Sequence, residues 1–268
     1  NATLAGSSGL AIGNVVGSNI ANVLLVLGVA ALLMPIAVEP AALKRDGWML
    51  LTGTGLFMAL AIRGEIDLFA GLVLLAYFIG FLVYSYLRER TSIDAVGEMY
   101  EHEVDDIDGV PHSLLKIMGF LVIGFAGLIY GADLLVEGGV AIARIFGVSE
   151  AVIGLTVIAF GTSLPELAAT VVAAIRKHSD VAIGNVVGSS IFNVVGIVGV
   201  VSVITPMEVP ALVINLDIWI MAAATLVLMP YMIGRRERLG RLEAFLFLAA
   251  YLIYIASIAY GFETLFPA

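Results

Sequence analysis

The chain has 268 residues, of which 61% are hydrophobic and only 13% are charged, and its formal net charge is −9. This composition excludes a water-soluble globular domain, whose surface would need more polar side chains. The absence of cysteine excludes a disulfide framework and a thiolate metal site.

Apolar runs long enough to cross a bilayer follow one another along the chain. Separated at polar segments, they predict helices near 10–34, 46–62, 67–88, 113–145, 149–176, 180–204, 211–233 and 241–262. Residues 1–9 are predicted to be the tail of a preceding helix. We therefore expect an all-α polytopic membrane protein with eight full transmembrane helices and the tail of a ninth in this chain.

One polar segment between these spans is strongly acidic. Residues 91–112 contain seven Asp and Glu and no Lys or Arg. Because this segment is polar and separates two apolar runs, we predict a solvated loop.

The basic residues sort to one side of the predicted membrane. Eleven fall on one face: Lys44, Arg45, Arg88, Arg90, Lys116, Arg176, Lys177, Arg235, Arg236, Arg238 and Arg241. Only Arg63 and Arg144 fall on the other. Since Lys and Arg are retained on the cytoplasmic side, we expect the 91–112 loop inside and the C-terminus outside. The short connecting loops indicate a prokaryotic origin, from which we expect a multi-pass protein of the cytoplasmic membrane.

Two segments of the chain are near copies of each other. At a constant offset of 171, Ala11–Ile36 and Ala182–Met207 are identical at 14 of 26 positions. Five predicted spans lie from the first copy up to the second, so the copies cross the membrane in opposite directions. An inverted-topology repeat is typical of secondary transporters. We expect a first half at 1–90 that lacks its N-terminal part, the acidic cytoplasmic loop at 91–112, and a second half at 113–268.

Each copy carries polar residues every four positions, and these share one helix face. They are Asn14, Ser18 and Asn22 in the first copy, and Asn185, Ser189 and Asn193 in the second. For the four deeper residues we favour a cation site. For Asn14 and Asn185, simple hydrogen bonding between packed helices is an equally good interpretation. Gly13 with Gly17, and Gly184 with Gly188, are expected to let a neighbouring backbone approach closely.

The segment Ala159–Glu166, AFGTSLPE, places a carboxylate within an apolar span. Pro165 has no N–H to donate, so the helix should kink or unwind here. The freed carbonyls, the hydroxyls of Thr162 and Ser163, and the carboxylate of Glu166 would then face one cavity. Oxygen donors without His or Cys suit sodium, calcium, magnesium or manganese. Glu166 as a protonated packing residue or a metal-free proton carrier is the alternative.

At the same offset, the counterpart of 161–166 would lie just before Asn1. We therefore expect that an N-terminal portion is missing, that it supplies a second GTS-x-PE-like motif, and that the full protein has ten helices.

The motifs GTSLPE at 161–166, GNVVGSSIFN at 184–193 and GNVVGSNIAN at 13–22 resemble the alpha repeats of the calcium/cation antiporter superfamily, particularly microbial sodium/calcium exchangers. The resemblance implies that Glu166 is a calcium ligand shared with the sodium sites, and that Ala159 and Thr162 contribute carbonyls. It also implies further side-chain or backbone oxygens from Ser163, Ser189, Asn193, Ser18 and Asn22. The long span from Leu114 would be one of two helices that slide over the rest.

From these features we expect a secondary active antiporter that exchanges sodium for calcium across the cytoplasmic membrane by alternating access. Its partners would be calcium and sodium ions and the lipid bilayer, with no cofactor and no nucleic acid. Many exchangers carry Asp where this chain has Asn193, which leaves the driving ion open. A proton-driven calcium (cation) antiporter is therefore the alternative, and a passive cation channel ranks below both. Because no histidine lies in a predicted span to activate a serine, we expect no enzyme.

Overall fold

Helices make up nearly all of the chain that the computed structural model describes, which is residues 8–38, 40–105, 113–145 and 159–259. The label η marks a π-helical turn. The first half of the chain contains α1 (Ser8–Ala21), η1 (Asn22–Val26), α2 (Leu27–Leu33), β1 (Ile36–Ala37), α3 (Pro40–Ala61), β2 (Glu65–Ile66) and α4 (Leu68–Asp105). The second half contains α5 (Leu114–Ile145), α7 (Ala159–Thr162), α8 (Leu164–Ile175), α9 (Ser179–Ile191), η3 (Phe192–Ile197), α10 (Val198–Ile204), β3 (Met207–Glu208), η4 (Val213–Asp217), α11 (Ile218–Val227), α12 (Met229–Met232), β4 (Arg238–Leu239) and α13 (Arg241–Ala259).

Six helical stretches within the described residues are long and apolar enough to cross a membrane. They are Ala11–Leu33, Leu68–Leu87, Leu115–Ile142, Ser179–Ile204, Val213–Met232 and Arg241–Ile258. Each lies within or close to a predicted span, which confirms a mostly helical protein with several membrane crossings. Helix α3 carries Lys44, Arg45 and Asp46 near its start, which lowers its apolar character. The count of eight full spans stays a prediction.

The predicted loop at 91–112 is wrong for its first part. Helix α4 continues without interruption from Leu68 to Asp105. The sequence there holds no proline before Pro111 and several good helix formers, including Ala95, Glu98 and Met99. High charge indicated solvation, and solvation does not prevent a helix.

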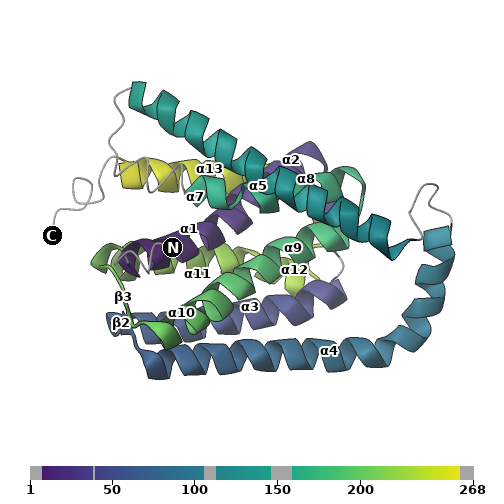
Figure 1. Cartoon of the computed structure of the whole chain (residues 1–268), viewed down its shortest axis with the longest axis horizontal. Coiled ribbons are helices and arrows are strands. Elements are labelled where there is room, and N and C mark those ends of the chain that lie inside the picture. The colour runs from purple at the N-terminus through teal and green to yellow at the C-terminus, as the bar shows by residue number, and fades with distance from the viewer. Residues whose placement is uncertain (1–7, 39, 106–112, 146–158, 260–268) are drawn as a thin grey trace.

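Figure 1 shows α3 and α4 along one edge of the molecule, and α5 crossing the opposite side near α7, α8 and α13. The termini of α3 lead to β1 at one end and β2 at the other. A helix of 22 residues is about 33 Å long, roughly the thickness of a bilayer core. The two strand pairs therefore lie at opposite ends of the bundle.

In each strand pair, the end of one sequence copy pairs with a strand that lies outside both copies. Strand β1 pairs with β4, with Ile36 opposite Leu239, and β2 pairs with β3, with Ile66 opposite Met207. Ile36 and Met207 occupy the same position of the repeat at the offset of 171. Each copy thus ends in a strand that pairs with a strand from the other half of the chain.

Both copies also contain a π-helical turn at the same place. In η1 the N–H of Leu27 bonds the carbonyl of Asn22, and after η3 the N–H of Val198 bonds the carbonyl of Asn193, each five residues back. A π-turn shifts the helix register by one residue and is frequent at functional sites. Both turns begin at or beside the predicted ligands Asn22 and Asn193.

Within the part of the chain that the structure describes, no neighbouring backbone approaches Gly13, Gly184 or Gly188 closely, because a Cβ added at any of them would meet no atom of a neighbouring element within 4 Å. The tight contact lies elsewhere, between α4 and α10. A Cβ at Gly199 would lie 2.9 Å from the backbone N of Leu75, and one at Gly71 would lie 2.8 Å from Cβ of Ser202. Small residues therefore bring two backbones together here, as in other membrane helix pairs.

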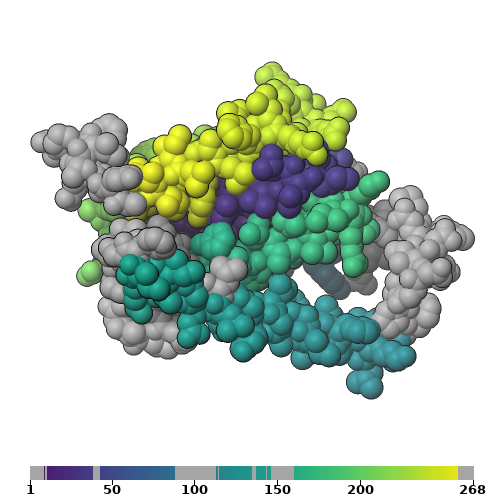
Figure 2. All heavy atoms as spheres, turned by 90° about the horizontal axis from the view of Figure 1, so that it is seen from above, coloured from purple at the N-terminus to yellow at the C-terminus, as the bar shows by residue number. Residues whose placement is uncertain are grey.

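Helix α5 lies on the outside of the molecule. In the space-filling view it runs along one side of the body formed by the purple, green and yellow segments (Figure 2). None of its 18-residue membrane window is buried, whereas 78% of the window in Ala11–Leu33 is buried. The helices of the sequence repeat thus form the interior, and α5 packs against it through α7 and α8.

Candidate cation site

The apolar span that contains Glu166 is broken at Ser163. Helix α7 ends at Thr162 and α8 begins at Leu164, and Ser163 between them has φ −95° and ψ 2°. Its N–H donates to the carbonyl of Phe160 at 3.1 Å, three residues back, which tightens the turn. The break predicted from Pro165 is therefore confirmed, and it places Glu166 in the first turn of α8.

Three buried side-chain oxygens near this break lack a hydrogen-bond partner among the described residues. They are Oγ of Ser163, Oε2 of Glu166 and Oδ1 of Asn22. Ser163 and Asn22 are only 2% and 1% exposed. An unsatisfied buried polar group costs about 1–3 kcal/mol, and more when it is charged. Because α8 contacts η1, which begins with Asn22, these oxygens belong to packed neighbouring elements.

A second set of contacts ties α7 to α1 of the first copy. The hydroxyls of Ser18 and Thr162 share a hydrogen bond of 3.2 Å, and the Thr162 hydroxyl donates to Oδ1 of Asn14 at 3.3 Å. These residues are 144 and 148 positions apart in sequence. Polar residues from both copies therefore meet directly at the helix break.

Asn185 holds the helix that carries Glu166. Its Nδ2 donates to the carbonyl of Glu166 at 3.2 Å and to Oγ1 of Thr170 at 2.9 Å. Of the two interpretations left open for Asn185, helix packing is the one these contacts support. The bond also fixes the backbone at Glu166.

The sequence did not single out Asn19 and Ser190, yet both lie at the centre of the contact between the copies. Nδ2 of Asn19 donates to the carbonyl of Ser190 at 3.0 Å, and Nδ2 of Asn22 donates to its hydroxyl at 3.4 Å. Nδ2 of Asn193 donates to Oδ1 of Asn19 at 3.1 Å. The sequence feature that could have pointed to them is their spacing, because Asn19 lies three residues before Asn22 and Ser190 lies three residues before Asn193.

The structure brings most of the predicted ligands into one neighbourhood. Ser18, Asn22, Thr162, Ser163 and Glu166 lie at the helix break or on elements that contact it. Asn193 reaches the same neighbourhood through Asn19. Ser189 is half-buried, and Ala159 begins α7.

The donor set is made of oxygens with little charge. Glu166 is the only ionisable residue among the eight predicted ligands. The described part of the chain contains no group of three or more His, Cys, Asp and Glu that could hold a metal ion. Hydroxyl, amide and carboxylate oxygens suit hard cations such as sodium and calcium.

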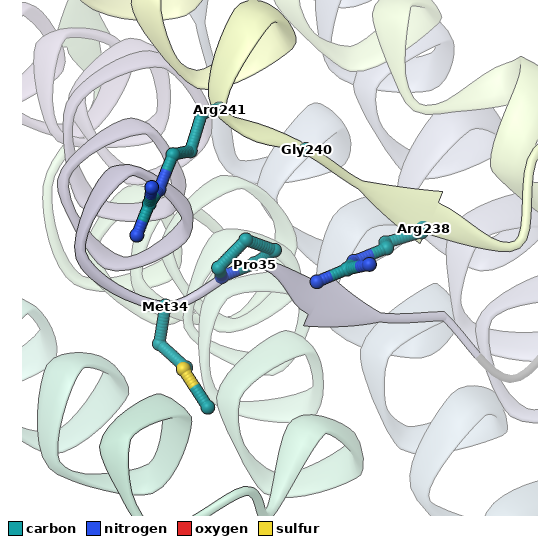
Figure 3. A pocket seen from close by; sticks show the side chains of 5 residues that line it. All are labelled: Met34, Pro35, Arg238, Gly240 and Arg241. Carbon is teal, nitrogen blue, oxygen red and sulfur yellow. The ribbon is translucent and has the colours of Figure 1, made fainter.

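The hollow shown in Figure 3 differs from the region around the helix break in the charge of its lining residues. It has a volume of about 550 Å³ and lies beside β4, lined by Met34, Pro35, Arg238, Gly240 and Arg241. Two guanidinium groups extend into it (Figure 3). Positive charge disfavours a cation, so this hollow is not a candidate for the cation site.

Comparison with known proteins agrees with this geometry. A family model described as sodium/calcium exchanger protein matches residues 1–87 and 116–260. The chain belongs to the sodium/calcium exchanger family. The match covers both sequence copies and the helix break with Glu166.

Several known proteins are similar to this chain over most of their length. The putative antiporter CaxA of Alkalimonas amylolytica is 38% identical over 248 residues, covering 91% of this chain and 76% of CaxA. The sodium/calcium exchanger MaX1 of Methanosarcina acetivorans is 31% identical over 290 residues, covering 97% and 83%. A structure of the sodium-calcium exchanger NCX_Mj superposes with a TM-score of 0.76 at 32% identity, covering 96% of this chain and 79% of that one. These relatives are named as transporters, not as enzymes.

Proposed function

We propose that this protein is a secondary active antiporter that exchanges sodium for calcium across the cytoplasmic membrane by alternating access. Its membership of the exchanger family supports this function. The observation that carries the site is the set of unpartnered buried oxygens of Ser163, Glu166 and Asn22 at the helix break. These oxygens lack hydrogen bonds among the described residues, and a cation would satisfy them.

The proposed ligands come from both halves of the chain. Side-chain oxygens of Glu166, Ser163, Ser18, Asn22, Ser189 and Asn193, with the carbonyls of Ala159 and Thr162, would surround the ions. Calcium takes six to eight oxygen ligands at about 2.3–2.6 Å. Sodium also prefers oxygen, so both ions would compete for overlapping ligands, and one would have to leave before the other could bind.

The negative charge of Glu166 gives a physical reason why sodium transport and calcium transport would be coupled. A bare carboxylate within the membrane is costly to bury. When the site closes over a bound cation, the charge is compensated, whereas an empty site would close at a high free-energy cost. The transporter would therefore change its side of access mainly when it carries sodium or calcium, which prevents leak of either gradient.

The two copies support an inverted-topology repeat, with eight full spans and halves at 1–90 and 113–268. The equivalent strands β1 and β3 each form a strand pair, one at each end of the bundle, and equivalent π-turns flank the proposed site. Two such halves could open the site alternately to each side. Helix α5, whose membrane window is unburied, would slide over the body during this change.

The charge distribution supports the proposed orientation. Lys44 and Arg45 near the start of α3 and the arginines around β4 belong to the end of the bundle that holds β1 and β4. Arg63 precedes β2 at the opposite end. Retention of basic residues inside would place the β1–β4 end, and the acidic segment that α4 enters near its C-terminal end, in the cytoplasm.

Transport in proteoliposomes tests this function. Vesicles loaded with sodium and diluted into sodium-free buffer should take up calcium-45, and uptake should stop when the sodium gradient is dissipated with an ionophore. Uptake driven by a proton gradient alone would replace sodium with protons as the driving ion. Uptake that follows voltage without either gradient would contradict antiport.

A further inference from the structure

We propose that Asn19 and Ser190 are positioning residues, each of which orients a ligand amide of the opposite repeat so that its oxygen, not its N–H, faces the transported cation. Asn19 would orient Asn193, and Ser190 would orient Asn22. The proposal rests on the proposed function, because it takes Asn22 and Asn193 as ligands.

The orientation begins at a backbone carbonyl, which can only accept a hydrogen bond. The side chain of Asn19 lies 3.0 Å from the carbonyl oxygen of Ser190, so the atom there must be its Nδ2. Oδ1 of Asn19 must then point the other way. It accepts from Nδ2 of Asn193 at 3.1 Å, and this bond in turn leaves Oδ1 of Asn193 on the side away from Asn19.

The other half of the network uses the Ser190 hydroxyl. Nδ2 of Asn22 donates to Oγ of Ser190 at 3.4 Å, and Oδ1 of Asn22 has no partner among the described residues. Asn19, Asn22 and Ser190 are all at most 3% exposed, so water is not freely available to replace these bonds. The amide of Asn22 therefore presents an oxygen that a cation would satisfy.

The two bonds are equivalent under the sequence repeat. At the offset of 171, Asn19 corresponds to Ser190 and Asn22 corresponds to Asn193. The bond from Asn22 to Ser190 thus matches the bond from Asn193 to Asn19. Each repeat supplies a ligand amide and also the group that orients the ligand amide of the other repeat.

The network gives a physical reason for a neutral residue at position 193. Asn193 donates an N–H to an oxygen that is itself fixed in place by the Ser190 carbonyl. An ionised aspartate has no hydrogen to donate, and its oxygen would repel Oδ1 of Asn19. The local charge of the site is consequently left to Glu166.

A purely structural role predicts different behaviour. If Asn19 only held α1 and α9 together, its loss would lower stability, and would lower the amount of active protein without changing the calcium concentration that gives half-maximal uptake. A positioning role predicts a change in that half-maximal concentration. It also predicts that the effect disappears when the ligand amide is already absent.

The test is a double-mutant cycle in full-length protein, assayed by sodium-driven calcium-45 uptake. Asn19→Ala should raise the half-maximal calcium concentration about tenfold, as should Asn193→Ala, and the double variant should be no worse than Asn193→Ala alone. Multiplicative effects in the double variant, or an unchanged half-maximal concentration in Asn19→Ala, would overturn the proposal.

A second variant keeps the test decisive if Asn19→Ala does not fold. Ser190→Ala deletes one hydroxyl, keeps the carbonyl that binds Asn19, and should weaken calcium binding through Asn22. Ser202→Ala is the matched control, because Ser202 is fully buried but its hydroxyl donates to Val198 within its own helix. Equal half-maximal concentrations for Ser190→Ala and the control would count against the proposal.

The melting temperature of each variant in detergent separates folding from positioning. Failure of the wild-type protein to exchange sodium for calcium would remove the proposed function itself. Normal exchange in the wild type, with half-maximal concentrations that Asn19→Ala and Ser190→Ala leave unchanged, would remove only the positioning role.

Discussion

Glu166→Gln is expected to reduce sodium-driven calcium uptake at least about a hundredfold, which corresponds to roughly 2.7 kcal/mol. Glutamine keeps the size of the side chain but removes the only formal charge among the eight proposed ligands. A dehydrated calcium ion then loses its strongest partner. Initial rates of calcium-45 uptake in proteoliposomes, normalised to inserted protein, measure the effect.

The matched control is Glu137→Gln. Glu137 is also a carboxylate in a membrane helix, but it is exposed on α5. This variant should retain uptake close to that of the wild type. Comparable uptake by Glu166→Gln and the wild type would show that the carboxylate at the break is not an ion ligand.

Ser163→Ala is expected to raise the half-maximal calcium concentration about tenfold, or roughly 1.4 kcal/mol, without lowering the melting temperature. The Ser163 hydroxyl is buried and makes no hydrogen bond among the described residues, so its removal sacrifices no such contact within the protein. The substitution does remove one of the oxygen ligands proposed for the bound ion. Uptake as a function of calcium concentration, together with thermal unfolding in detergent, gives both quantities.

Ser257→Ala should show the opposite pattern. The hydroxyl of Ser257 donates to the carbonyl of Tyr254 at 2.7 Å, so its hydrogen bond is made within its own helix, α13. Its loss should lower stability slightly and leave the half-maximal calcium concentration unchanged. If Ser163→Ala instead destabilised the protein and bound calcium normally, Ser163 would be a packing residue.

Much of the helical framework could be predicted from sequence because membrane spans are specified by long apolar runs, which a chain displays directly. The break before Glu166 was also predictable, since Pro165 removes a helix hydrogen bond regardless of context. Residues at this break, such as Thr162 and Ser163, could be singled out because polar groups at this depth are costly without a partner.

Other features depend on three-dimensional contacts that spacing does not specify. The spacing of Gly184 and Gly188 predicted a close approach, but the close contact forms at Gly71 and Gly199. Asn19 and Ser190 differ between the copies, so identity alone did not draw attention to them. Their role emerges only because the fold places one beside the other, 171 residues apart.

The location of a bound ion tests the central claim most directly. Crystals soaked in strontium, a heavier analogue of calcium, would reveal the ion by its anomalous scattering. We predict a peak at the α7–α8 break, within roughly 2.6 Å of the Glu166 carboxylate and in contact with Ser163, at about the distances at which oxygens bind calcium. A peak confined to the exposed carboxylates of α5, with none beside Glu166, would contradict the account.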